Sequence, residues 1–319
     1  MTAVIPTRDR WPLLLRAVES VLRQDHGSME VIVIDDGSAS PPPEDPLLRD
    51  GRVRVLRNPR SLGVGAARNR AIGESDGEWL GFLDDDDVWA PSKVRRQLES
   101  AHGEANVGLV YGSALNVTWQ LDPIGVYPAL DAATALPRLL EHNHVPAGAS
   151  NILARRTAVR EVRGFDEKLP KLTDWDLWIR VLTISDAATV PDVVVAYVQH
   201  AQAMSTTDCG PLLDEYARFR RKHAALAQRL GIRVSARAFL SWAVGRQRSV
   251  SRSAAARCSL AGGVRFREPR SLARGAGMLL LPPALGDGLS ARRGRAPGGR
   301  PRETPDWLVH YRPNGVDGV

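Results

Sequence analysis

Short apolar runs in the first hundred residues each end directly in a polar cluster, and this pattern constrains the fold more than any other feature of the sequence. The runs occupy residues 3–5, 31–34 and 79–83. Continuous apolar runs are typical of strands that are covered on both faces. After the first run, Trp11 to Gln24 carries apolar residues at helical spacing, and Pro12 suits the first turn of a helix. Strands that alternate with helices predict a parallel sheet with right-handed crossovers.

The polar clusters that follow these runs span residues 7–9, 35–36 and 84–87. Because ligands of α/β sheets bind beyond the carboxyl ends of the strands, we expect the three clusters to meet at one edge. Further strands are predicted at 52–56, 107–111, 151–154 and 193–198. Further helices are predicted at 63–72, 91–98, 175–182 and 213–230, with a last one from residue 235 into the 250s.

Charge divides the chain unevenly. Arg218 to Arg302 contains 20 basic residues against two acidic ones, a net charge of +18, whereas the remainder carries −11. Such a basic part suits a phosphate-bearing partner, namely anionic lipid, nucleic acid or a nucleotide-bearing substrate, although a solvated helical face explains the same composition. Residues 286–302 are rich in Gly, Pro and Arg, which predicts a mobile segment. Beyond them, Trp307 to Tyr311 suits a short strand or helix that docks on the body.

Two cysteines, Cys209 and Cys258, are too few for a disulfide framework or a cysteine-based zinc site. We expect each to be a small, partly buried side chain in a reducing cytoplasm. The N-terminus lacks the features of a secretory signal, and no run of about 18 apolar residues is present. The sequence therefore predicts a cytoplasmic protein that is soluble or membrane-peripheral.

Asp84 to Asp87 form the strongest candidate site. Four consecutive carboxylates at a strand end repel one another, so a positive group is expected beside them. A hard divalent cation such as Mg²⁺ or Mn²⁺, which also bridges phosphate oxygens, prefers oxygen ligands. The alternative is a solvated acidic loop or a helix N-cap, with Asp87 before Pro91.

Two further clusters suit a nucleotide. The carboxylate of Asp36 can accept from a nucleobase N–H or a ribose hydroxyl, although Asp-Gly after a strand is also ordinary turn chemistry. Residues 63–69 open a helix after a glycine-rich turn, where backbone N–H groups can face an anion, but they match neither the P-loop nor the dinucleotide fingerprint. Arg68 in this segment suits either a phosphate clamp or an ion pair with the acidic segment.

The order of these motifs resembles that of glycosyltransferase family 2. The matching segments are Val4-Ile5-Pro6-Thr7-Arg8-Asp9-Arg10, Val33-Ile34-Asp35-Asp36-Gly37-Ser38, Gly65-Ala66-Ala67-Arg68-Asn69, Phe82-Leu83-Asp84-Asp85-Asp86-Asp87, Gly164-Phe165-Asp166-Glu167 and Thr173-Asp174-Trp175-Asp176-Leu177-Trp178-Ile179-Arg180. The likeness covers residues 1–206, and this order is specific where each piece alone is not. It implies an α/β fold of the GT-A class, a Rossmann-like and mostly parallel sheet flanked by helices, here with a C-terminal helical, basic extension.

The resemblance implies that the GT-A domain has two halves, and the composition of the chain beyond them predicts a third part. Residues 1–105 would be the nucleotide-sugar-binding half of the GT-A domain, and 106–212 the acceptor-binding and catalytic half. Residues 213–319 would be the helical basic extension.

The donor-binding residues of the family carry over position by position. The turn from Pro6 through Thr7 to Arg8, together with Asp36, would hold the nucleobase. Arg8 stands where the family often has an aromatic residue, and a guanidinium can also stack on a π face. Arg68 would face the donor phosphates.

The acidic segment matches the family's Asp-x-Asp element at residues 84–86. Asp84 or Asp85 would contact the ribose or the ion, and Asp86 would be the main ligand of Mn²⁺ or Mg²⁺. His200, after the final predicted strand, would approach the diphosphate or the metal.

The catalytic base of the family lies in a Glu-Asp pair, of which Thr173 replaces the Glu and Asp174 is retained. Asp174 is therefore the candidate base that takes the proton of the acceptor hydroxyl, and a helix N-cap is its alternative role. Asp176 is expected to cap or pair on the same helix.

We therefore expect a metal-dependent inverting glycosyltransferase of the hexosyltransferase class. It would move a sugar from a nucleoside-diphosphate sugar, with UDP favoured, to a hydroxyl of a glycan or natural-product acceptor. The alternatives are a polyprenyl-phosphate glycosyltransferase and a non-catalytic GT-A-like binding protein with a basic tail for membranes or RNA. In the leading interpretation the basic part makes peripheral contact with anionic membrane, and no nucleic-acid partner is expected. The sequence does not identify the sugar, the nucleobase or the acceptor.

Overall fold

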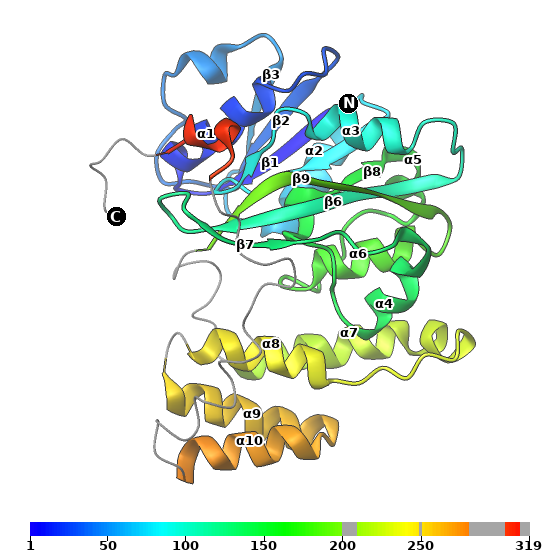
Figure 1. The fold of residues 1–319 in the computed structure, drawn as a ribbon. Coiled ribbons are helices and arrows are strands. Elements are labelled where there is room, and N and C mark those ends of the chain that lie inside the picture. The colour runs from blue at the N-terminus through cyan, green and yellow to red at the C-terminus, as the bar shows by residue number, and fades with distance from the viewer. Residues whose placement is uncertain (200–208, 249–250, 281–303, 313–319) are drawn as a thin grey trace. The chain divides into compact units, whose positions relative to one another are not determined.

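The apolar runs become the central strands of one mixed sheet with helices on both faces (Figure 1). Its strands are β1 (Thr2–Thr7), β2 (Glu30–Asp35), β3 (Val53–Arg57), β4 (Trp79–Phe82), β5 (Val88–Trp89), β6 (Val107–Val117), β7 (Pro123–Tyr127), β8 (Leu153–Arg155) and β9 (Asp186–Val198). Their order is β3-β2-β1-β4-β8-β6-β9-β5, and β7 pairs with β6. β1 runs parallel to β2 and β4, and β2 runs parallel to β3. The predicted α/β class with a parallel core is confirmed.

The structure, a computed structural model, describes residues 1–199, 209–248, 251–280 and 304–312. Two compact units divide the chain: residues 1–136, 144–199 and 296–319 form the first, and residues 137–143 and 200–295 the second. The helices of the first unit are α1 (Trp11–Leu22), α2 (Val64–Glu74), α3 (Lys93–Ser100), α5 (Arg156–Glu161), α6 (Thr173–Val181) and α12 (Asp306–Val309). Those of the second are α7 (Cys209–Arg229), α8 (Arg237–Arg248), α9 (Arg252–Phe266) and α10 (Pro269–Leu280), and α4 (Ala135–Glu141) spans the boundary.

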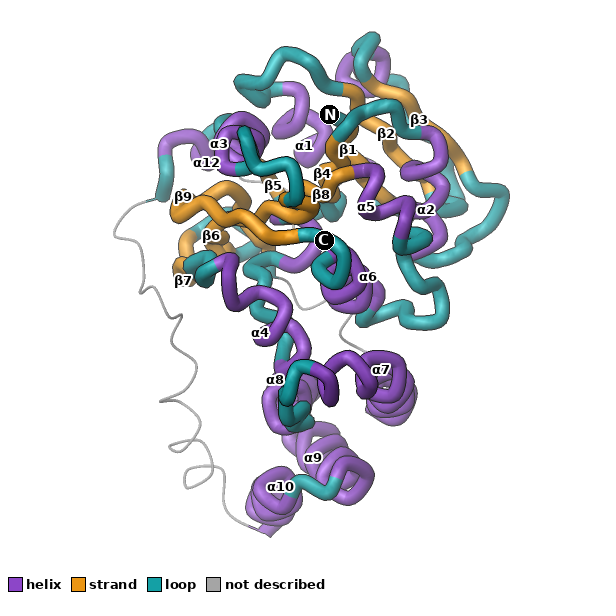
Figure 2. The backbone as a smooth tube through the Cα atoms, turned by 90° about the vertical axis from the view of Figure 1, so that its right-hand side faces the viewer, coloured by secondary structure: helices purple, strands orange, loops and turns teal. Residues whose placement is uncertain are grey.

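Side chains alternate between the two faces of the central strands. On one face, Ile5 and Val33 pack with Leu14 of α1 in a buried cluster. On the other, Phe82 of β4 meets Phe165 edge to face, with ring centroids 5.2 Å apart. Figure 2 shows α1 and α3 on one side of the strands and α6 on the other. This two-sided burial explains why the runs are continuously apolar rather than alternating.

Strands β6 and β9 are longer than the sequence predicts, since the expected segments were 107–111 and 193–198. The two strands pair in parallel over most of their length. This pairing satisfies backbone groups of segments that carry no continuous apolar run, so local patterns do not mark them. The last predicted helix is two helices, α8 and α9. Within the described ranges, no helix is both long enough and apolar enough to span a bilayer.

The second unit is a group of helices in which α9 packs against α7, α8 and α10, as the helical extension predicts. Gly263 lets α9 approach α10 closely, because a Cβ there would lie 2.7 Å from the side chain of Leu272. Tyr216 of α7 stacks on Phe239 of α8 with ring centroids 3.7 Å apart. The segment expected to be mobile, 286–302, lies outside the described residues.

Cys209 and Cys258 form a disulfide, which corrects the prediction that each is only a small buried side chain. Their Cα atoms are 5.6 Å apart, a separation that a disulfide spans without backbone movement. The two residues are 49 positions apart, and the packing of α7 on α9 brings them together. A count of two cysteines contains no information about that packing. Because Cys209 and Cys258 are paired, they do not support the reducing cytoplasm that the sequence predicts from them.

Residues 306–311 dock on the first unit as a short helix, one of the two forms that their sequence suits. Leu308 of α12 is fully buried, and Tyr311 is nearly so. Both lie in a cluster with Val88 of β5 and Leu115 of β6. Nε2 of His310 also lies 2.8 Å from the carboxylate of Glu19 in α1. The C-terminal segment is thus part of the core of the first unit.

Leu308→Ala is expected to lower the free energy of unfolding by about 2–5 kcal/mol, because it opens a cavity under α12. Val309→Ala is the matched control, since Val309 is half exposed on the same helix. Chemical denaturation of both variants measures the difference. Equal, small effects would show that α12 is not held by burial of Leu308.

Lys93 is fully buried at the start of α3. Its Nζ donates to Oε1 of Gln97 at 2.6 Å and lies 4.2 Å from the ring centroid of Trp89. Burial lowers the pKa of Lys93 well below its ordinary value. The folded chain therefore binds fewer protons at this side chain than the unfolded chain, so folding stability rises with pH between the two pKa values.

Lys93→Met is expected to flatten this rise in the free energy of unfolding, because methionine has nothing to titrate. The measurement is urea denaturation at a series of pH values from neutral to the unfolded-state pKa of lysine, about 10.4. The exposed residue Lys168 provides the control, and Lys168→Met should leave the slope as it is. A wild-type slope in Lys93→Met would show that Lys93 does not contribute it.

Candidate functional site

The three polar clusters meet at one edge of the sheet, as their positions after the apolar runs predict. Thr7 at the end of β1 is paired with Asp35 at the end of β2. β4 runs parallel to β1 and ends opposite Val4, so the chain that follows β4 leads toward the same edge. The hydroxyl of Thr7 donates to the carboxylate of Asp85 at 2.7 Å. The first and third clusters are thus in direct contact, although 78 positions separate them.

Three of the four consecutive aspartates turn toward one another. Carboxylate oxygens of Asp84, Asp86 and Asp87 all lie within 4.8 Å of one another. Asp85 turns away, because its carboxylate is held by Thr7 and Arg10. The predicted donor residue Asp84 and the predicted metal ligand Asp86 therefore lie together, and Asp87 joins them in place of Asp85.

Arginines from two other elements balance this negative charge. Arg10, at the N-terminus of α1, forms an ion pair with Asp85 and a second one, at 2.9 Å, with Asp86. Arg68 of α2 is buried and lies 2.5 Å from the carboxylate of Asp84. Of the two roles that the sequence leaves open for Arg68, the structure displays the ion pair with the acidic segment.

Asp87 is the most deeply buried of the four aspartates. Its carboxylate accepts from the hydroxyl of Ser150 at 2.5 Å and from the backbone N–H of Val198 at 2.9 Å. Burial raises its pKa well above the ordinary value, and the neighbouring carboxylates of Asp86 and Asp84 add to the rise. Asp87 does not cap α3, whose N-cap residue is Ser92. This position corrects the N-cap role that sequence analysis weighed for Asp87.

The Asp85 carboxyl group is also buried. Burial raises its pKa to about 6, although hydrogen bonds from Arg10 and Thr7 favour the carboxylate. Those hydrogen bonds hold the Asp85 side chain in one orientation, away from the other three carboxylates of the acidic segment.

Asp36 is held by its own neighbourhood. Its carboxylate accepts from the side chains of Asn58 and Ser61 at 2.8 Å each, and from the backbone N–H groups of Leu62 and Gly63 at 2.9 Å each. Although burial raises the pKa of Asp36, these hydrogen bonds outweigh it and lower the pKa. The anion that the glycine-rich turn faces is therefore Asp36 itself, which fixes the entrance of α2.

The predicted nucleobase turn begins with Pro6, which is buried inside β1. Arg8 follows it with 59% of its side chain exposed, and its guanidinium lies 3.6 Å from the carboxylate of Asp9. Asp9 has a left-handed backbone, with φ of 56°. Its backbone N–H donates to the hydroxyl of Ser38 at 2.8 Å, which joins the turn to the Asp36 loop. The exposed guanidinium group of Arg8 thus lies just beyond the carboxyl end of β1.

Asp174 lies in the first turn of α6 and faces the same region. A Cβ placed on Gly148 would lie 3.0 Å from its carboxylate, so glycine at that position leaves room for the side chain. Burial raises the pKa of Asp174, the charge of Arg68 lowers it, and the charge of Asp84 adds to the rise. Asp174 is therefore close enough to the acidic segment to sense its charge.

Asp176 has a different role, which confirms its expected pairing on the same helix. Its fully buried carboxylate accepts from Arg180 at 2.7 Å. Arg180 in turn donates to the backbone carbonyl of Gly164 at 2.7 Å. Trp175 and Trp178 on this helix are buried core residues.

The acidic group fits a hard divalent cation by its chemistry. Asp84, Asp86 and Asp87 present only carboxylate oxygens, the ligands that Mg²⁺ and Mn²⁺ prefer. His200, the other predicted ligand, lies outside the described residues.

Sequence reasoning missed Arg10, Ser150 and Gly148 as parts of this site. Arg10 is the last residue of the first matching segment, but its partner lies 75 positions away, so no local signal predicts its role. Ser150 and Gly148 belong to a short 3₁₀ helix, Gly148–Asn151, in the region where sequence patterns were least regular. Their roles depend on where the loop before β8 folds.

Family models place these features in a known group of proteins. The model described as glycosyl transferase family 2 matches residues 2–163, just over half of the chain. A model described as glycosyltransferase like family 2 matches residues 129–236. The chain belongs to glycosyltransferase family 2, as its motifs predict.

Curated relatives carry related names. The chain is 33% identical to the pre-mycofactocin glycosyltransferase of Mycobacterium tuberculosis over 193 residues. The matched segment covers 57% of this chain and 39% of that protein. It is 38% identical over 102 residues to the succinoglycan biosynthesis protein ExoO of Rhizobium meliloti, 32% of this chain and 29% of that protein. The putative colanic acid biosynthesis glycosyl transferase WcaA of Escherichia coli is 27% identical over 228 residues, 69% of this chain and 79% of that protein. The chain thus spans less than half the length of the first two.

Solved structures share the fold. The mannosyltransferase PcManGT from Pyrobaculum calidifontis, in complex with GDP-Man and Mn²⁺, has a TM-score of 0.54 at 17% identity, over 92% of this chain and 80% of that one. Residues 1–349 of TarS from S. aureus have a TM-score of 0.53 at 14% identity, over 96% of both chains. TarS has also been solved in complex with UDP. These likenesses show the fold alone, and they confirm the predicted GT-A class.

Proposed function

We propose that this chain is a glycosyltransferase that moves a sugar from a nucleoside-diphosphate sugar to an acceptor hydroxyl with inversion at the anomeric carbon. The observation that carries the proposal is the group of Asp84, Asp86 and Asp87 at the carboxyl edge of a GT-A sheet, with Asp174 near enough for the charge of Asp84 to raise its pKa. Family membership supports the reaction class. The relatives favour neither the polyprenyl-phosphate enzyme nor the non-catalytic binding protein.

The donor would lie along the ends of β1, β2 and β4. Arg8 stands exposed where it can stack on a nucleobase, and Pro6 and Thr7 support its turn. Asp36 would contact the nucleobase from the loop in which its carboxylate is hydrogen-bonded. Neighbours of the same fold were solved with UDP and with GDP-Man, which supports a nucleoside-diphosphate donor and leaves the base to experiment.

Asp84, Asp86 and Asp87 would hold Mn²⁺ or Mg²⁺, with Asp86 as the main ligand. When bound, such an ion neutralises charge on the leaving diphosphate. Arg10 and Arg68 would orient these carboxylates and add positive charge beside the donor phosphates. Asp85, held by Thr7 and Arg10, would keep the segment in its conformation.

Asp174 would accept the proton of the acceptor hydroxyl. A general base works best when its pKa lies near the working pH, and burial moves the pKa of Asp174 upward in that direction. Gly148 leaves room beside this carboxylate, because it has no side chain. The hydroxyl oxygen would attack the anomeric carbon while the nucleoside diphosphate leaves from the opposite face. Asp176 is committed to Arg180 and would not take this role.

Asp86→Ala is expected to raise the Kd for UDP in the presence of Mn²⁺ by at least about tenfold, a loss that even residues outside the ligand set of a metal site cause. Isothermal titration with UDP, GDP and TDP, with Mn²⁺ or EDTA, measures it. Asp25→Ala is the matched control, because Asp25 also pairs with an arginine at 2.9 Å but lies away from the edge. Wild-type affinity in Asp86→Ala would refute the ligand assignment.

Asp174→Asn is expected to lower turnover by about 10²–10⁴-fold, because the amide keeps the size of the side chain but does not accept a proton near neutral pH. The Kd for the donor should change by less than about threefold, since the acidic segment is untouched. Turnover is measured as release of nucleoside diphosphate with an acceptor identified by mass spectrometry.

Asp45→Asn is the control for this substitution, since Asp45 likewise accepts from the backbone N–H of the residue two positions on, Leu47 at 2.9 Å, and lies outside the matching motifs. It should keep its activity. Near-normal turnover in Asp174→Asn would remove Asp174 as the base, and a parallel loss of donor affinity would assign it to the donor site.

A further inference from the structure

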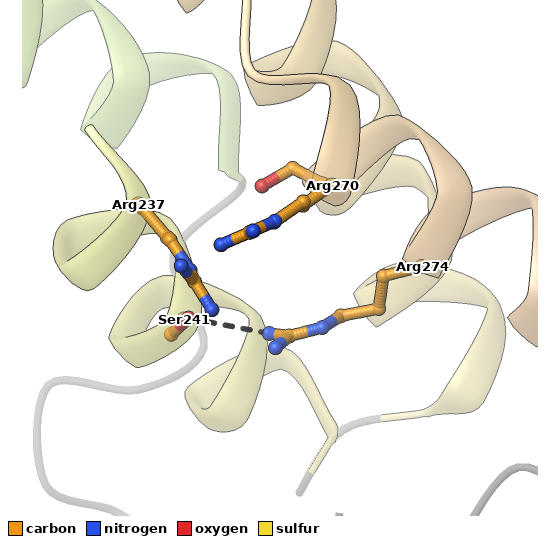
Figure 3. A pocket seen from close by; sticks show the side chains of 5 residues that line it. Arg237, Ser241, Arg270 and Arg274 are labelled. Carbon is orange, nitrogen blue, oxygen red and sulfur yellow. Dashed lines mark hydrogen bonds between the residues drawn. The ribbon is translucent and has the colours of Figure 1, made fainter. Parts of the chain in front are cut away.

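A cavity in the second unit is lined by three arginines and two serines. It has a volume of about 370 Å³, and its lining residues are Arg237, Ser241, Arg270, Ser271 and Arg274. Figure 3 shows the guanidinium groups of the three arginines turned toward one another across the cavity. No carboxylate belongs to the lining.

Helix geometry explains how the cationic groups come together. Arg237 and Ser241 are four residues apart on α8, and Arg270 and Arg274 are four residues apart on α10. Residues at this spacing lie on one face of a helix. α8 and α10 both pack on α9 and touch each other, so the two faces border one space. A guanidinium N–H of Arg274 donates to the hydroxyl of Ser241 at 3.4 Å across it.

Charge in this region is not balanced from within the cavity. In the part of the chain that the structure describes, neither Arg237 nor Arg270 forms an ion pair. The nearby carboxylate of Glu268 accepts from the hydroxyl of Ser235 at 2.9 Å and the backbone N–H of Ala236 at 3.1 Å. By contrast, Arg265 on α9 pairs with Asp214 at 2.6 Å. The like charges of Arg237 and Arg270 repel one another, and a bound anion would remove that cost.

We propose that this arginine pocket binds a phosphate or diphosphate group. Guanidinium groups match phosphate oxygens in pairs of parallel hydrogen bonds, and three of them from two helices enclose one multiply charged anion. The hydroxyl of Ser241 adds a neutral donor. The volume is at the lower end of the range for small-molecule sites, about 300–1,000 Å³, which suits a phosphate-bearing group better than a whole sugar nucleotide.

The phosphate can belong to a soluble molecule or to a lipid headgroup. Apolar side chains on the same two helices are exposed: Trp242 beside Ser241 on α8, and Leu279 and Leu280 at the end of α10. Helices that expose apolar side chains together with basic ones are typical of surfaces that meet a membrane. The chemistry recognised is the same in both cases, so the two sources are separated by experiment.

The test uses the full chain in EDTA and compares two triple variants. One replaces Arg237, Arg270 and Arg274 of the pocket by Gln. The other replaces Arg221, Arg229 and Arg257, exposed arginines on α7 and α9, by Gln and so removes the same charge elsewhere in the second unit. Titration calorimetry with sodium pyrophosphate forms one arm. Cosedimentation with phosphatidylcholine vesicles, with and without phosphatidylglycerol, forms the other.

The pocket variant is expected to lose at least about tenfold in affinity in one arm, while the control variant stays within about twofold of the wild type. Loss in the pyrophosphate arm alone assigns a soluble phosphate, and loss in the vesicle arm assigns a lipid headgroup. Equal losses in both variants, or no wild-type binding in either arm, would overturn the proposal. Arg270→Gln alone, at an exposed position, keeps the test valid if the triple variant does not fold. Because binding is measured without metal or acceptor, the result is independent of glycosyltransferase activity.

Discussion

Ion pairs between two arginines and a run of four aspartates are the interaction on which the catalytic edge depends. Arg10 reaches Asp85 and Asp86 from the N-terminus of α1, and Arg68 reaches Asp84 from α2. Adjacent carboxylates repel by about 1 kcal/mol per pair at 4 Å in water, and by several times that amount where water is excluded. The arginines offset this repulsion and at the same time join α1 and α2 to the end of β4. The edge is thus ordered by charge as well as by apolar packing.

The same pairs determine what a ligand would meet. On the proposed function, a divalent cation competes with Arg10 and Arg68 for oxygens of Asp86 and Asp84. The guanidinium groups of Arg10 and Arg68 would then be left to face the diphosphate of the donor. Asp87 keeps its bonds to Ser150 and Val198, since neither partner is cationic. A site with internal counterions avoids the cost of holding its carboxylates unpaired when no donor is present.

The second unit handles charge differently. Its core is held by aromatic stacking, by close contact at glycine and by the Cys209–Cys258 disulfide. The basic excess lies on the outside of these helices. Where Asp214 is available, an arginine is paired, whereas in the arginine pocket the lining residues supply no acid. The opposite net charges of the two regions of the sequence therefore correspond to two kinds of site, one acidic with internal arginines and one basic without internal acids.

The sequence by itself determined the parallel core, the meeting of three polar clusters, the family and the pairing of Asp176 on its own helix. These features are encoded by residues close together along the chain, through apolar periodicity, helical spacing and the order of motifs. Only the tertiary structure decided the partner of Arg10, the donors around Asp36, the length of β6 and β9, and the disulfide. Each of these features depends on contacts between residues tens of positions apart. The side chains involved also occur on solvent-exposed surfaces, so their residue types alone do not predict the contacts. Local sequence patterns predict which residues are buried. The packing of helices and loops determines which partners the polar side chains have.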